Sequence, residues 1–229
     1  MAAADILSRN RAFIAARTRL APVEGLVLMH QDVPQLLHIW QADEITPIWA
    51  ATEEDLDREG IEPPFWAFPW AGGQAVARLI LERPEIVRGK RVLDIACGSG
   101  MVGIAAAAAG ASAVSVNDID PICEAAAGLN GEANGVCLQW IGGNLLDRPP
   151  ADFDVILAGD IFYERTMAQR FLTWLRQAAA GGAAAYAGDP GRAYAPQGKA
   201  GLLAEYDIAT SLELESVSQR HARVWQIGT

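Results

Sequence analysis

The sequence has few of the residues that mark secreted, metal-binding or membrane proteins. Its 229 residues contain only three cysteines, Cys97, Cys123 and Cys137, and three histidines. Cysteines that are so few and so widely spaced argue against a disulfide framework and against a zinc site. The longest mostly apolar run, residues 101–116, is shorter than the ~20 residues that a membrane-spanning helix needs. We therefore expect a cytoplasmic protein with no metal and no membrane anchor.

Positive charge is also scarce. The chain carries 18 lysines and arginines against 28 acidic residues, a formal net charge of −10. Nucleic-acid binding needs a basic face that neutralises phosphates, so this balance argues against a nucleic-acid partner. An acidic surface suits a protein partner that presents lysine. The length and the 51% hydrophobic content indicate one sizeable folded core.

The first 22 residues are rich in alanine and arginine and superficially resemble a transit peptide. Asp5 argues against that reading, and Phe13, Ile14 and Leu20 fit one face of a docked helix. We therefore predict an integral N-terminal segment.

The character of the chain changes near residue 88. Residues 1–88 are rich in tryptophan, proline and charge, with helical patterns at 33–40 and 73–81. We interpret them as a helical and aromatic segment that packs on the core, and residues 89–229 as the main domain.

Short apolar runs alternate with helical patterns after residue 90. Strands are expected at 91–96, 113–117, 136–141, 153–159 and 183–188, and helices at 101–109, 121–134 and 166–180. Residues 208–215 and 222–227 alternate polar and apolar side chains, as a terminal hairpin does. The pattern predicts an α/β fold with a doubly wound, Rossmann-like, seven-strand sheet, mostly parallel with an antiparallel C-terminal hairpin. Such a sheet binds ligands at the carboxyl ends of its strands.

The strongest motif is VLDIACGSGMVG at 92–103, a strand that runs through a glycine turn into a helix. Gly98 and Gly100 allow a ligand to approach the backbone, and the start of the helix offers free N–H groups. Asp118 ends the next strand 20 residues after Gly98, where its carboxylate can accept both hydroxyls of a ribose. The turn and the acid together predict a nucleoside ligand.

The charge of Asp94 distinguishes between two such ligands. Gly98, Gly100 and Gly103 also match the spacing of the dinucleotide fingerprint. A carboxylate at the end of this strand would repel a pyrophosphate, but it would attract the cationic amino and sulfonium groups of S-adenosylmethionine. We therefore favour S-adenosylmethionine over NAD, and a methyltransferase over a dehydrogenase.

Further candidate residues follow the other strands. The Asn144 amide and the Leu145 backbone could bind the adenine edge, and Ile119 could pack on the adenine face. An acid and two aromatic rings would lie beside the reactive end of the donor, in the segment containing Gly159, Asp160, Phe162 and Tyr163. The alternatives are core packing for the two rings and a turn or cap role for Asp160.

The motif Asp160-Ile161-Phe162-Tyr163 matches the Asp-x-x-Tyr signature of a group of seven-strand protein-lysine methyltransferases. The segments PFWAFPWAGGQ at 64–74, DIDP at 118–121 and GDPGR at 188–192 carry the likeness further. The chain resembles class I S-adenosylmethionine-dependent methyltransferases, and within them the electron transfer flavoprotein β-subunit lysine methyltransferase group, including bacterial members. The resemblance extends from about Phe13 to Gln226, and one departure is Ala96, where the class pattern has glycine.

The resemblance implies an S-adenosylmethionine site, with electron transfer flavoprotein β subunit as the favoured protein substrate. It implies cofactor contacts for Trp70, Gly98, Gly100, Asp118, Asn144, Leu145, Gly159 and Asp160. Other acceptors remain open: a ribosomal protein or a small amine. A binding protein with this fold but no turnover is the alternative of another class.

Neutralising a lysine with a pKa near 10.4 at pH 7 costs about 4–5 kcal/mol. No motif supplies an obvious general base, but an aromatic slot would lower the lysine pKa by desolvation. The candidate walls of this slot are Trp66, Phe68, Trp70, Phe162 and Tyr163. We expect Asp160 and Tyr163 to act in catalysis, with Asp160 orienting the amine.

Overall fold

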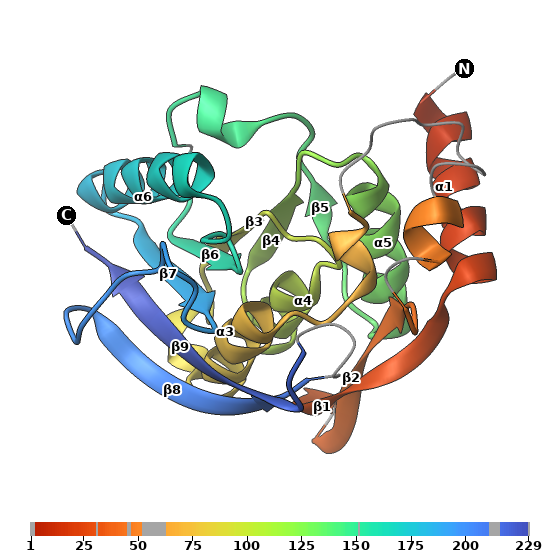
Figure 1. The fold of residues 1–229 in the computed structure, drawn as a ribbon, viewed down its shortest axis with the longest axis horizontal. Helices are drawn as coiled ribbons and strands as arrows, with labels where there is room; N and C mark the ends of the chain where they lie inside the picture. Colours follow the sequence, from red (N-terminus) through yellow and green to blue (C-terminus); the bar gives the residue numbers. More distant parts are fainter. Residues whose placement is uncertain are drawn as a thin grey trace.

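The computed structural model describes residues 3–30, 32–44, 47–51, 63–150, 152–210 and 216–228 (Figure 1). Its centre is a seven-stranded sheet with the order β5-β4-β3-β6-β7-β9-β8. The strands are β3 (Arg91–Ile95), β4 (Ala113–Asn117), β5 (Gln139–Trp140), β6 (Val155–Gly159), β7 (Ala184–Asp189), β8 (Leu202–Ala209) and β9 (Gln219–Ile227). Strands β3 to β7 pair in parallel, and β9 runs antiparallel to both β7 and β8. The predicted seven-strand, mostly parallel sheet with an antiparallel hairpin is confirmed.

Helices cover both faces of the sheet. On one side lie α3 (Ala71–Glu82), α4 (Met101–Ala108) and α5 (Ile122–Ala133), and on the other lies α6 (Arg165–Ala180) (Figure 1). Alternate strand residues enter the two cores: Val155 and Leu157 pack on the first side, Ile156 and Ala158 on the second. This period of two explains why the parallel strands read as continuous apolar runs. Among the described residues, no helix combines the length and apolar character needed to cross a bilayer.

Strands β5 and β8 differ most from their predicted bounds. Strand β5 contains only Gln139–Trp140, although a strand was expected over 136–141. Strand β8 begins at Leu202, before the expected start at 208, and residues 211–215 lie outside the described residues.

Helix α1 (Ala3–Arg17) packs on α5, and its Phe13 and Ile14 are buried as predicted. The Arg11 guanidinium and the Glu132 carboxylate of α5 form an ion pair at 2.5 Å. Leu20 does not belong to this face, because it lies on the following strand and is 43% exposed. The division between residues 88 and 89 stays a prediction.

The helix predicted over 33–40 is wrong. Strands β1 (Arg19–His30) and β2 (Val33–Gln41) form a separate two-stranded antiparallel sheet, at the end of the molecule away from α6 (Figure 1). The apolar residues of this segment also fit helical spacing, but the buried side chains are Leu37 and Ile39, two residues apart. They pack with Ala77 of α3 and with α4, so tertiary contacts select the strand.

Amide side chains in the last turn of α5 and at its C-cap bind the edge of β2. Asn134 Oδ1 accepts the His38 N–H at 2.9 Å, and Asn134 Nδ2 donates to the His38 carbonyl at 2.6 Å. Asn130 Oδ1 accepts the Trp40 N–H at 2.7 Å, and its Nδ2 donates to the Ser99 carbonyl at 2.8 Å. Asn130 therefore joins β2 to the glycine turn.

Helix α3 confirms the prediction at 73–81, and its first turn lies directly on the strand ends. A Cβ atom on Gly159 of β6 would lie 2.6 Å from the Gly73 Cα, and one on Gly188 of β7 would overlap the Gly72 carbonyl oxygen. The two backbones approach so closely because all four positions are glycine. This contact brings the α3 N-terminus to the carboxyl edge of the sheet.

Candidate active site

A cavity of about 510 Å³ opens at the carboxyl ends of β3, β4 and β6. This is the edge where β3 separates β4 from β6, and where a doubly wound sheet binds its ligands. Seven of the predicted cofactor residues line it: Trp70, Asp94, Gly98, Asp118, Ile119, Asn144 and Gly159. The predicted Trp66, Phe68, Asp160 and Tyr163 line it as well. Its size suits a nucleoside-sized ligand.

Asp94 lies at the bottom of this cavity and is 1% exposed. Its Oδ2 accepts the Gly103 N–H of α4 at 2.8 Å. The pKa of Asp94 is raised to about 7, chiefly by burial and also by the negative charge of Asp118, while the Gly103 hydrogen bond opposes this rise. A cationic group in the cavity would therefore stabilise the ionised carboxylate.

Asp118 follows β4 and binds the glycine turn that follows the neighbouring strand β3. Its Oδ2 accepts the Gly98 N–H at 2.9 Å, and its Oδ1 accepts the Asp120 N–H at 3.1 Å. Burial raises the pKa of this carboxyl, and the two backbone hydrogen bonds oppose that rise. The Cys123 thiol, a weak donor, also contacts this carboxylate. Once a ligand displaces it, each carboxylate oxygen can accept a second hydrogen bond, one from each of two hydroxyls.

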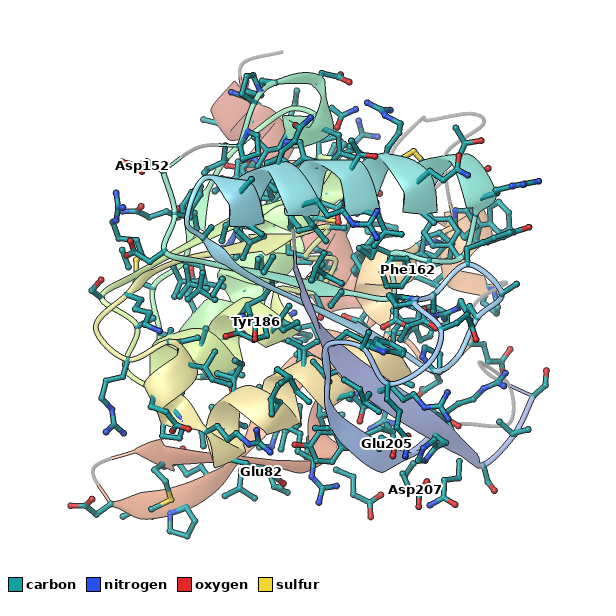
Figure 2. The ribbon with its side chains drawn as sticks, turned by 90° about the vertical axis from the view of Figure 1, so that its left-hand side faces the viewer. Glu82, Asp152, Phe162, Tyr186, Glu205 and Asp207 are labelled. Carbon is teal, nitrogen blue, oxygen red and sulfur yellow. The ribbon has the colours of Figure 1, made fainter. Side chains whose placement is uncertain are left out.

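Three predicted site residues lie elsewhere. Gly100 has a φ of 77°, and a Cβ there would lie 2.8 Å from the Ala127 Cβ, so this glycine permits α5 to pack on the turn. Leu145 is buried in the core, and its neighbour Leu146 lines the cavity instead. Phe162 is fully buried under α6, away from the cavity lining (Figure 2). The core-packing alternative applies to this ring.

An aromatic cluster forms one wall of the cavity. The Phe65 ring centroid lies 5.7 Å from that of Trp70 and 5.9 Å from that of Tyr163. Trp70 Nε1 donates to the Phe65 carbonyl at 2.7 Å, which fixes the indole. Phe65 and Tyr163 are 40% and 53% exposed, so they stand at the entrance. Phe65 is the aromatic residue that sequence reasoning missed, although it belongs to the PFWAFPW segment.

Trp66 belongs to the same segment but faces a different environment. It is 1% exposed, contacts the core that includes Phe13, and still lines the cavity. Its indole N–H has no hydrogen-bond partner among the described residues. Buried polar groups are nearly always paired in folded proteins, so this donor is available to a bound ligand or water.

Asp160 is held by two elements that are distant in sequence. Its Oδ2 accepts the Gly73 N–H of α3 at 2.7 Å, and its Oδ1 accepts a hydrogen bond of 2.5 Å from Arg192 Nη1. Arg192 Nη1 also donates to Asp189 Oδ2 at 3.2 Å. Arg192 ends the GDPGR segment, but no sequence pattern links it to Asp160, 32 positions earlier, so its role in the cavity is not predictable from the sequence.

The comparisons with known proteins agree with this geometry. The family described as ribosomal protein L11 methyltransferase (PrmA) matches residues 77–167. The electron transfer flavoprotein β-subunit lysine methyltransferase of Xenopus laevis is 39% identical over 168 residues, covering 71% of this chain and 68% of that protein. The enzyme of the same name from Rattus norvegicus is 37% identical over 187 residues, covering 79% and 73%. The chain belongs to the family of electron transfer flavoprotein β-subunit lysine methyltransferases.

Membership confirms the predicted class of enzyme, a methyltransferase. A solved structure, of a proposed RNA methyltransferase from Pyrococcus horikoshii, shares the fold with a TM-score of 0.53 at 14% identity. It covers 72% of this chain and 88% of that one, and at this identity it shows the fold alone.

Two strand ends of the methyltransferase have strained backbones. Ala96 and Asp160 follow β3 and β6 with φ values of 55° and 59°, in the left-handed region. This conformation costs an alanine roughly 1–2 kcal/mol and an aspartate less. Both residues line the cavity, where such strain is commonly found in proteins. The departure from the class pattern at Ala96 therefore falls on a position where glycine would be unstrained.

The cavity thiols of the methyltransferase are shielded. Burial raises the pKa of Cys97 and of Cys123 well above the usual value, and neighbouring carboxylates raise it further. Because the thiolate is the reactive form, both side chains are weak nucleophiles at neutral pH. Within the described part of the chain, no group of three histidine, cysteine, aspartate or glutamate residues could hold a metal ion.

Proposed function

We propose that this methyltransferase transfers methyl groups from S-adenosylmethionine to lysine side chains of the electron transfer flavoprotein β subunit. The acceptor follows from the relatives, which are named for that activity and are 35–39% identical over 64–73% of their own lengths in five species. The observation that supports the donor is the placement of two carboxylates, the buried Asp94 and the partly buried Asp118, which both bind backbone N–H groups around the glycine turn.

The residues present fit this donor. Asp118 has acceptor capacity for the ribose hydroxyls, and Asp94 offers a buried negative charge to a cationic ligand. Asn144 and Ile119 line the same cavity at the position expected for adenine. When bound, S-adenosylmethionine would supply an electrophilic methyl group on a sulfonium.

The aromatic entrance fits a lysine side chain. Phe65, Trp70 and Tyr163 would enclose the aliphatic stem and remove water from the amine, which lowers the pKa of a lysine. The same rings attract a methylated ammonium by cation–π interaction. Asp160 lies at this wall of the cavity and would orient the amine by accepting a hydrogen bond.

The remaining partner predictions follow from composition. The net charge of −10 supports a protein partner over a nucleic acid. The free thiols Cys97, Cys123 and Cys137 support a cytoplasmic location.

Methyl transfer is tested by incubating the protein with labelled S-adenosylmethionine and three acceptors in parallel. These are purified electron transfer flavoprotein β subunit, ribosomal protein L11 and a small pyridine-type amine. We expect label on lysine residues of the flavoprotein subunit, identified by peptide mass spectrometry. More efficient methylation of L11 or of the amine would reject the proposed acceptor. No transfer to any of them, with S-adenosylhomocysteine still bound, would support the non-catalytic alternative.

A further inference from the structure

We propose that Arg192 is a positioning residue for methyl transfer, which aims the Asp160 carboxylate at the acceptor and makes the lysine amine bind in its uncharged form. The inference rests on the lysine methylation proposed above and adds a role for Arg192, the last residue of the GDPGR segment, to which the sequence assigns none. It is carried by the contacts of Arg192 at the end of β7.

Arg192 is fixed at both ends. Asp189 ends β7, is completely buried, and its Oδ1 accepts the N–H groups of Gly191 at 2.7 Å and Arg192 at 2.6 Å. The same aspartate receives the guanidinium through its Oδ2. From this turn the Arg192 side chain extends to the cavity wall, where it is 25% exposed.

Asp160 is fixed from the opposite side by α3. The Gly73 N–H occupies one lone pair of Oδ2, and Arg192 occupies one of Oδ1, so each oxygen keeps one for an incoming amine. Arg192 and the positive end of the α3 dipole both oppose the charge of this carboxylate. Asp160 can therefore orient an amine without strongly favouring its protonated form.

The charges that face the cavity show what Arg192 contributes. The titratable groups are Asp94 in β3 and Cys97 after it, Asp118 and Asp120 after β4, Cys123 in α5, Asp160 and Tyr163 after β6, and Arg192 after β7, with Asp189 behind it. The first turn of α3 and the 3-10 helix η1 (Phe65–Ala67) carry no charged side chain. Among the described lining residues, Arg192 is the only cation. Without it, the carboxylates would draw a lysine in as an ammonium.

Methyl transfer requires the lysine amine in its uncharged form. The amine must present a lone pair, which forms the N–C bond while the C–S bond breaks and the sulfur keeps the electron pair. The new alkylammonium then loses one proton to solvent before a further transfer. A fixed positive charge a few ångströms from the amine lowers its pKa by about 1–2 units at the effective dielectric of a protein surface.

The test is the pH dependence of kcat, which reports groups in the enzyme–substrate complex. Wild type, Arg192→Gln and Arg192→Lys are compared between pH 6.5 and 10 at saturating S-adenosylmethionine and flavoprotein subunit. On the acidic limb of the profile, kcat rises with pH as the bound lysine loses its proton. For Arg192→Gln we expect this limb to move to higher pH by about one unit, so that kcat is roughly tenfold lower at pH 7.5 and returns to the wild-type value at high pH. Arg192→Lys keeps the charge, so the acidic limb of its kcat–pH profile should stay in place, while kcat falls because the shorter, more flexible side chain holds Asp160 less firmly.

A second variant predicts a shift of opposite sign. Asp189→Asn keeps an oxygen that accepts the Gly191 and Arg192 N–H groups but removes one negative charge, so the limb should move to lower pH. Binding of S-adenosylhomocysteine and the melting temperature report whether each variant keeps its fold and cofactor site.

An unmoved limb in Arg192→Gln overturns the inference. If that variant does not fold, an unmoved or raised limb in Asp189→Asn overturns it instead. A wild type that methylates no lysine overturns both this inference and the proposed function, whereas an active wild type with unmoved limbs overturns this inference alone.

Discussion

The backbone N–H of Gly73 donates a 2.7 Å hydrogen bond to Oδ2 of Asp160, across 87 residues of sequence. Gly73 lies in the first turn of α3, and that turn can reach the end of β6 only because no Cβ atom stands between the two backbones. The glycine contact that packs α3 on the sheet therefore also holds the carboxylate expected to orient the acceptor.

Gly159→Ala should damage this contact. The added Cβ would lie 2.6 Å from the Gly73 Cα and 2.8 Å from its N, and backbone atoms cannot rotate away. Overpacking of this kind costs about 1–3 kcal/mol of unfolding free energy. Denaturant unfolding measures it, with Gly228→Ala as the matched control, because a Cβ there meets nothing within 4 Å. Equal midpoints for the two variants would show that the contact is not tight.

Asp118→Ala should weaken S-adenosylmethionine binding without unfolding the domain. The loss of hydrogen bonds to two ribose hydroxyls corresponds to roughly 1.5–3 kcal/mol, or 10- to 150-fold in Kd. Calorimetry measures it, with Asp207→Ala as the control. Asp207 lies on the outer strand β8 and contacts His221, outside the cavity lining (Figure 2). Unchanged affinity in Asp118→Ala would mean that the nucleoside binds elsewhere.

Asp160→Asn keeps the shape of the side chain and removes its charge. Turnover should fall by about 100-fold, near 3 kcal/mol in the barrier, because a neutral amide with one acceptor oxygen replaces the charged carboxylate that orients the amine. The Kd for the cofactor should change much less, since Gly98 and Asp118 are untouched. Tyr163→Phe, measured in the same assay, separates a hydroxyl role from a packing role. Near-normal kcat in Asp160→Asn would make Asp160 a structural turn residue.

Cofactor binding should depend on pH through Asp94. Burial raises its pKa to about 7, so the empty cavity holds a proton there that a cationic ligand must displace. Affinity for S-adenosylmethionine should therefore rise about tenfold between pH 6 and 8 and then level off. Stability of the empty protein should change in the opposite direction, falling as pH rises from about 4 to 7, because the folded state binds this proton more tightly than the unfolded chain.

Asp94→Asn provides the control for both trends, since an amide cannot titrate. Its affinity should be low and flat with pH, and its stability should lose the decline between pH 4 and 7. Calorimetry at several pH values measures the first, and denaturant unfolding measures the second. A wild-type affinity that does not change over this range would assign the cavity charge to another group.

The central strands of the sheet could be predicted from the sequence because β3, β4 and β6 are buried on both faces and therefore appear as unbroken apolar runs. The segment at 33–41 was not, since its apolar residues fit helical and extended spacing alike, and contacts with α3 and α4 decide between them. The cavity acids Asp94 and Asp118 could be predicted because they stand at fixed distances from a glycine turn.

The residues around Asp160, where we propose that the acceptor lysine binds, were harder to predict. Phe162 and Tyr163 are adjacent in a motif, yet the strained turn at Asp160 precedes one ring that enters the core and another that reaches the entrance. Arg192 and Gly73 reach Asp160 from distant segments, and only the pairing of β6 with β7 and the approach of α3 bring them together.

The amide contacts on β2 have a consequence for self-association. A strand with an unpaired edge is a template for pairing with another chain, and proteins commonly protect such edges. Asn130 and Asn134 occupy the backbone groups of His38 and Trp40 that a neighbouring strand would otherwise bind. Two side chains spaced one helical turn apart thus block intermolecular β-pairing at this edge, as a charged or proline residue does in other proteins.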